Sequence, residues 1–230
     1  MKRYKFLFCT GLLSVSLLFS SCYKYEKDIS YAAVNGSMID VFTNTTLDYG
    51  TITVLPAQLV NGSMVLDTSG HFTDMRMMPG MYTFHGAITN NASFTSDSAT
   101  VTLTAGTTAP AVNLKVAPFV SILSNVTAVT DTTITISYTI QGNNGLLPSK
   151  QGIFYSLTAK PTVQSYTKNP LLITPAPGSE NGKFSYTITG LTANTTYNII
   201  VAALAGSGTV NPGNNYNQGR EMIVTTAKTP

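Results

Sequence analysis

Hydrophobic and polar residues alternate along several short stretches of the chain, most regularly between Thr133 and Ile140. Three isoleucines and one tyrosine take every second position of that stretch, and threonine or serine takes the positions between them. Successive side chains of a β-strand point to opposite faces of its sheet. The pattern therefore predicts a strand with one buried and one solvated face.

Similar runs recur along the chain in two series, separated by turn sequences rich in glycine, proline and serine. The first series consists of Val34–Asp40, Thr51–Leu55, Ser63–Leu66, Met81–Ile88, Ala99–Thr104 and Val112–Val116. The second series consists of Val120–Val129, Thr133–Ile140, Gly152–Leu157, Phe184–Thr189, Tyr197–Leu204 and Glu221–Thr226. No long segment has the 3.6-residue period of a helix. We therefore predict an all-β fold of two tandem β-sandwich domains.

The predicted boundary between the two domains lies at Ala117-Pro118, where the first series ends. Proline cannot donate a hydrogen bond to a strand ladder, and it favours an extended conformation in the residue before it. The sequence thus predicts a short, stiff link, with one domain at residues 31–117 and the other at residues 118–230.

The run "TITGLTANTTYNIIVAA" carries a specific fold signal in the second domain. Leu191, Thr195 and Tyr197 resemble the L-x-P-x-T-x-Y stretch of fibronectin type III domains, with Ala193 in place of the usual proline. The resemblance implies a tyrosine corner, in which the tyrosine hydroxyl returns to the backbone of the preceding turn.

The first domain resembles the carboxypeptidase-regulatory or transthyretin-like sandwich. "VNGSMID" is similar to the opening strand of that family, and "LDTSGHFTDMRMMPGMYTF" to its central motif. The matching positions are Asp67, Gly70, Phe72, Pro79, Gly80 and Tyr82. The resemblance implies turns at the glycines and the proline, with Phe72 and Tyr82 in the core.

The N-terminus has the three parts of an export signal. A basic start precedes the apolar run from Phe6 to Phe19, which is shorter than the roughly 20 residues that a helix needs to span a bilayer. "LFSSC" then resembles the bacterial lipobox, so residues 1–21 are the predicted signal peptide and Cys22 the predicted lipidation site. Residues 22–30 would form a lipidated tether, and lipid would be the only attachment to the membrane.

Cleavage of the signal changes both the thiol content and the charge of the chain. Cys9 would leave with the signal, so no thiol would remain after acylation of Cys22. Three of the 13 Lys and Arg residues and none of the 10 Asp and Glu residues lie in the signal, which leaves ten bases and ten acids. A neutral chain without a basic stripe is not expected to bind nucleic acid.

The sequence offers little material for catalysis or metal binding. Asp67 and Asp74 flank one predicted hairpin, but most acids lie at predicted turns, where aspartate caps local backbone. His71 and His85 are the only histidines, and a zinc site needs three or four clustered ligands. We therefore expect no catalytic residues, no metal and no cofactor.

The order of lipobox, regulatory-like sandwich and fibronectin-like sandwich resembles a group of Bacteroidetes lipoproteins of unknown function. Such proteins are usually encoded beside SusC/SusD-type glycan importers. The resemblance implies a non-enzymatic outer-membrane protein, facing the cell exterior, that assists glycan capture with an importer as partner. A structural spacer or adhesin-like module without a small ligand is the alternative.

A carbohydrate site would combine aromatic faces with planar amides, and the chain has 12 Tyr but no Trp. The resemblance to fibronectin type III domains implies that the loops at 141–150 and 205–218 face the linker and the first domain. The candidate ligand-binding residues are Tyr166, Tyr216, Asn143, Asn144, Asn214, Asn215 and Gln218. We expect them either to line a cleft between the domains, or to hold the domains together or be merely solvated.

Overall fold

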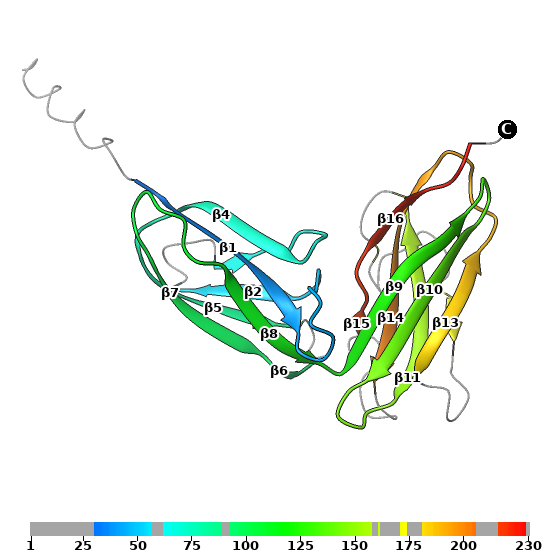
Figure 1. The fold of residues 1–230 in the computed structure, drawn as a ribbon, viewed down its shortest axis with the longest axis horizontal. Coiled ribbons are helices and arrows are strands. Elements are labelled where there is room, and N and C mark those ends of the chain that lie inside the picture. Colours follow the sequence, from blue (N-terminus) through cyan, green and yellow to red (C-terminus); the bar gives the residue numbers. More distant parts are fainter. Residues whose placement is uncertain are drawn as a thin grey trace, which may run out of the picture.

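The structure, a computed structural model, is built of β-strands (Figure 1). It describes residues 30–56, 62–88, 93–157, 161, 171–173, 181–205 and 216–228, the backbone alone for 171–173. Every regular element within these ranges is a strand, which confirms the all-β prediction. The predicted signal peptide and Cys22 lie outside the described residues.

Two facing sheets form the first sandwich. The strands of one sheet, in spatial order, are β4 (His71–Met77), β1 (Ala32–Asp40), β8 (Val112–Pro118) and β6 (Ser93–Thr95). The strands of the other sheet are β3 (Ser63–Met64), β2 (Thr51–Leu55), β5 (Gly80–Ala87) and β7 (Asp97–Leu103). β1 and β8 run parallel, and the other neighbours run antiparallel.

Aromatic side chains fill the core of the first sandwich, and the predicted burial of Phe72 and Tyr82 is confirmed. The ring of Phe72 stacks on that of Phe84, with 5.9 Å between centroids. Gly36 makes room for this packing, because a Cβ atom there would collide with the Phe72 ring and the Val112 carbonyl oxygen. The glycine of the opening strand is therefore a packing requirement.

The second sandwich sets a three-stranded sheet against a larger one. The first comprises β13 (Gly182–Ile188), β10 (Ile134–Gly142) and β9 (Val120–Val129). The second comprises β12 (Leu171–Ile173), β11 (Pro148–Ser156), β14 (Thr196–Ala205), β15 (Tyr216–Gln218) and β16 (Met222–Thr225). β15 and β16 pair with successive parts of β14 and together form one interrupted edge strand.

The predicted tyrosine corner is present in the second sandwich. The backbone N–H of Thr192 donates a hydrogen bond of 2.9 Å to the hydroxyl oxygen of Tyr197. The Tyr197 side chain is buried with Leu191 in the core cluster between the two sheets. This bond fixes the turn that precedes β14.

Four short or irregular strands, β4, β6, β12 and β15, were not predicted. In β4, Phe72 and Met77 are both buried although five positions separate them, because a register shift against β1 interrupts the alternation. The loop prediction for Tyr216 and Gln218 is wrong, since both lie in β15. Three residues between polar neighbours are too few for a readable alternation.

The link between the sandwiches is a single residue. β8 continues through Pro118, which pairs with Ser93, and Phe119 alone separates it from β9. Pro118 is tolerated because the pairing of β8 with β6 is irregular there, with a register shift between Ser93 and Thr95. Among the described strands, no ladder joins one sandwich to the other, and the domain limits at 117 and 118 stay a prediction.

We predict that Tyr197→Phe lowers the free energy of unfolding by about 1 kcal/mol, because the Thr192 N–H loses its acceptor. Denaturant unfolding followed by circular dichroism measures the change. Tyr186→Phe is the control, since it removes a hydroxyl from a half-buried ring packed on the same core. Equal effects of the two substitutions would contradict a special role for the corner.

Candidate functional site

The ring of Phe119 packs against both sandwiches at their junction. It contacts the core cluster of the second sandwich and the small cluster of Met38 and Val116 at the near end of the first. It also meets the ring of Phe94 edge-on, with 4.8 Å between centroids. The link is thus anchored by apolar packing on both sides.

A buried amide ties the two sandwiches together beside this ring. The side chain of Asn217 is fully buried, and its Oδ1 accepts a hydrogen bond of 2.9 Å from the N–H of Val120. Its Nδ2 donates to the hydroxyl oxygen of Tyr49 at 3.3 Å. One side chain therefore connects β15, the start of β9 and the loop before β2.

Two more contacts between the sandwiches flank this amide. The N–H of Glu221 donates to Oδ2 of the buried Asp48 at 2.8 Å. The guanidinium of Arg220 donates to the Thr68 carbonyl oxygen and to Oγ of Ser69, both at 3.2 Å. Hydrogen bonds to charged groups are stronger than neutral ones, so these contacts limit rotation about Phe119.

The turn that receives Arg220 is itself rigid. Oδ1 of Asp67 accepts hydrogen bonds from the N–H groups of Ser69 and His71. The bond from His71 and then that from Ser69, with the nearby charges of His71 and Arg220, lower the pKa of the Asp67 carboxyl. Asp67 thus acts as a local cap, as the sequence predicts for most of the acids.

Asn143 is a buried residue that holds the linker by hydrogen bonds. It is buried, and its Nδ2 donates to the Pro118 carbonyl oxygen at 3.0 Å and to Oγ of Ser121 at 2.8 Å. Its backbone N–H donates to the Phe119 carbonyl oxygen. Asn144 is exposed and has a φ of 50°. The loop after β10 therefore reaches the linker as predicted, but its first asparagine holds the junction together.

In the described part of the chain, the other residues predicted to bind a ligand are not seen to contact Asn143. Tyr216 packs edge-on against Phe154 at 6.5 Å, in a cluster with Ile200 and Ala202. These residues lie on the face of their sheet opposite to Asn217, and burial raises the pKa of the Tyr216 hydroxyl. Gln218 is half-buried. Tyr166, Asn214 and Asn215 lie outside the described residues.

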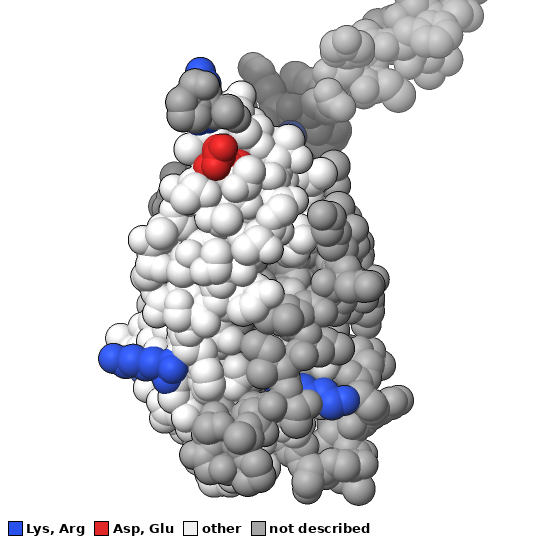
Figure 2. Space-filling view, turned by 90° about the vertical axis from the view of Figure 1, so that its right-hand side faces the viewer, with Lys and Arg blue, Asp and Glu red and all other residues white. Residues whose placement is uncertain are grey.

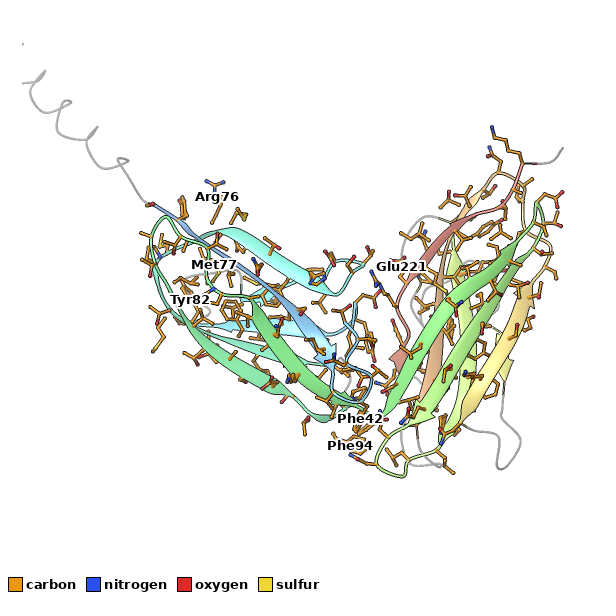
Figure 3. The ribbon with its side chains drawn as sticks, viewed as in Figure 1. Phe42, Arg76, Met77, Tyr82, Phe94 and Glu221 are labelled. Atoms are coloured by element: carbon orange, nitrogen blue, oxygen red, sulfur yellow. The ribbon has the colours of Figure 1, made fainter. Side chains whose placement is uncertain are left out.

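The structure instead places two exposed phenylalanines at the junction, which we call the junction aromatic pair. Phe42 follows β1 and is 40% exposed; Phe94 lies in β6 and is 37% exposed. β1 and β6 flank β8 on its two sides, so these two strands lie two strand spacings apart, about 10 Å. Figure 3 shows both at the end of the first sandwich nearest the second.

Each member of the junction aromatic pair is held in position. The N–H of Phe42 donates to Oδ1 of Asp40 at 2.8 Å, and Asp40 is only 1% exposed. Phe94 rests on Phe119. These two residues were not predicted from the sequence. The available signal was an aromatic residue near polar residues. Phe42 lies just beyond a predicted strand, and Phe94 follows an Asn-Asn dipeptide.

The described residues include no group of three or more His, Cys, Asp or Glu side chains that could hold a metal ion. His71 pairs with Ser37 in one sheet and His85 with Thr53 in the other. The Asp74 carboxylate accepts a hydrogen bond from the N–H of Arg76.

On the face of the second sandwich in Figure 2, charged side chains are few and scattered. No helix within the described ranges is long and apolar enough to span a membrane.

No protein-family model matches the chain, and a comparison with curated protein sequences finds no match. Solved structures do match. A DUF3823 family protein from Parabacteroides merdae is 16% identical, with a TM-score of 0.60 over 86% of this chain and 100% of its own. A DUF3823 family protein from Bacteroides uniformis is 12% identical, with a TM-score of 0.57 over 85% and 99%.

A third solved structure, a "putative carbohydrate binding protein" from Bacteroides uniformis, is 12% identical, with a TM-score of 0.55 over 84% of this chain and 98% of its own. Identities this low establish a shared fold and nothing finer. The match covers nearly the whole length of these proteins, so the shared fold includes both sandwiches. All three proteins come from Parabacteroides or Bacteroides, in agreement with the resemblance to Bacteroidetes lipoproteins.

We predict that Asn217→Ala lowers the free energy of unfolding by about 2 kcal/mol, because the buried N–H of Val120 loses its acceptor. Small-angle scattering should also show a wider range of angles between the sandwiches. Asn125→Ala, at an exposed position of β9, is the control. Unchanged scattering from Asn217→Ala would show that the amide does not set the angle.

The junction should open at alkaline pH. Burial, partly offset by hydrogen bonds from Asn217 and the Gln218 backbone, raises the pKa of the Tyr49 hydroxyl well above 10.0, and the carboxylates of Asp40 and Asp48 add to the rise. The neutral hydroxyl therefore stabilises the fold fully below about pH 10, and this contribution is lost at higher pH.

Tyrosinate absorbance during an alkaline titration, recorded together with scattering, measures this opening. Tyr49→Phe should weaken the alkaline transition, because phenylalanine cannot ionise. A transition of unchanged midpoint and steepness in that variant would contradict the assignment to Tyr49.

Proposed function

We propose that this protein is a non-catalytic, lipid-anchored protein of the outer cell surface that binds glycan chains and assists a SusC/SusD-type importer. The observation that carries the proposal is the junction aromatic pair, two exposed rings on a rigid junction. Aromatic rings offer large apolar faces at a low entropic cost of ordering, and sugar rings present apolar C–H faces to stack on them.

The site has the properties expected of a preorganised binding surface. Ligands often bind where two domains meet, and a site that is already rigid loses little entropy on binding. Asp40 fixes the turn of Phe42, Phe119 supports Phe94, and exposed Asn144 lies on the loop beside the linker. One solved structure of the same fold carries carbohydrate binding in its name.

The lipid anchor and the importer partner rest on the sequence. The lipobox-like "LFSSC" supports acylation of Cys22, which would hold the molecule at the membrane. The resemblance to lipoproteins encoded beside importers supports a SusC/SusD-type partner. Mass spectrometry of the purified protein tests the first part, and co-purification with an importer from the native membrane tests the second.

A structural spacer is the second candidate function, and one observation favours it. The side-chain amides of Asn143 and Asn217 form hydrogen bonds that hold the two sandwiches together. A rigid connection of this kind is also what a spacer between a membrane and a partner needs.

We predict that Phe42→Ala combined with Phe94→Ala weakens glycan binding at least about tenfold, since each ring should contribute on the order of 1 kcal/mol. Wild-type protein is first screened against plant, host and microbial glycans, and the affinity of the best ligand is then measured by calorimetry.

Tyr31→Ala is the matched control for this prediction, because Tyr31 has nearly the same exposure, 38%, at the other end of the first sandwich. Circular dichroism checks that the double variant folds. If the wild type binds no glycan in the panel yet co-purifies with an importer, the spacer function replaces the binding function. Saturable binding that the double variant retains would place the site elsewhere.

A further inference from the structure

Exposed apolar side chains gather at the end of the first sandwich that lies opposite the junction. We call this group the N-terminal rim; it consists of Tyr31, Leu55, Met75, Met78 and Met81. Met75 and Met81 are 66% and 68% exposed. Single exposed apolar residues are common on protein surfaces, but several of them at one end of a domain point to a contact surface.

Strand register places the members of the rim at one end. Ala32 pairs with Met77, so Tyr31 and the end of β4 are neighbours, and Met78 lies in the turn that follows. Leu55 pairs with Thr83, two residues from Met81, and both project from the outer face of the same sheet. The rim therefore includes side chains from both sheets.

The chain enters the sandwich at this same end. Figure 3 shows Arg76 and Met77 beside the start of β1. Between Cys22 and Tyr31 the tether spans at most about 30 Å even when fully extended. A lipid attached to Cys22 would thus keep the rim within reach of the bilayer surface, and this constraint rests on the proposed lipid anchor.

We propose that the N-terminal rim inserts shallowly into the lipid surface and holds the first sandwich upright on the membrane. The chemistry of the rim suits the boundary between headgroups and acyl chains. Methionine is flexible and apolar, and tyrosine favours membrane interfaces. The guanidinium of Arg76 lies 5.4 Å from the centre of the Tyr31 ring, where it can reach lipid phosphates.

Methionine oxidation measures this contact directly. Lipidated protein is reconstituted into vesicles of phosphatidylethanolamine and phosphatidylglycerol, treated with hydrogen peroxide and analysed by mass spectrometry. The rim methionines of the lipidated protein should oxidise about fivefold more slowly than those of Cys22→Ser protein in solution without vesicles or detergent, because oxidation follows solvent exposure. Met64, in β3 and outside the rim, is the internal control and should not change.

Variants test whether the rim itself binds lipid. Unlipidated Cys22→Ser protein should float with the vesicles in a density gradient to a measurable extent, and Met75→Gln with Met81→Gln should abolish this flotation. Leu123→Gln with Ile223→Gln, at exposed positions of the second sandwich, is the matched control and should leave it unchanged. Equal flotation of all three proteins would overturn the proposal.

The remaining outcomes separate this inference from the proposed function. Acylated protein whose rim methionines stay unprotected overturns the rim alone. A chain that carries no lipid on Cys22 overturns the anchor alone, and the flotation of unlipidated protein then decides the rim. Protection that disappears when the protein is diluted tenfold in lipid indicates that a second copy covers the rim, and it also overturns lipid docking. Glycan affinity is measured separately and does not depend on any of these results.

Discussion

The arrangement of this molecule depends on the hydrogen bonds of one buried amide. Asn217 sits at the point where the second sandwich begins, and its two polar atoms are shared between Val120 and Tyr49. Burying an amide without partners is costly, so the two sandwiches are most stable in the one orientation that satisfies it. The two sandwiches meet beside the exposed rings of Phe42 and Phe94, which Asp40 and Phe119 hold in place.

The parts of the fold that follow simple periodicity could be predicted from the sequence. β10 alternates cleanly because one of its faces packs on the core and the other meets solvent. Tyr197, Phe72 and Tyr82 were predictable because a tyrosine corner and a glycine-proline turn each leave a local signature. β4 was missed because its register shift breaks the alternation, and β15 because three residues show no period.

The sequence predicted the position of one loop at the junction but not which residues are exposed there. The loop after β10 does reach the linker, yet Asn143 is buried there. Whether an asparagine points into a junction or into solvent depends on tertiary packing, which no local pattern records. Phe42 follows β1 and Phe94 lies in β6, and only the sheet order shows that these strands flank β8.

The single residue between β8 and β9 has a consequence for how such chains can vary. Side chains alternate between faces at every step of an extended chain, so one residue added or removed beside Phe119 would turn the second sandwich by about half a revolution. Asn217 and Arg220 would then face away from their acceptors. Insertions and deletions should accordingly be tolerated in the outer turns of both sandwiches and selected against at this one step.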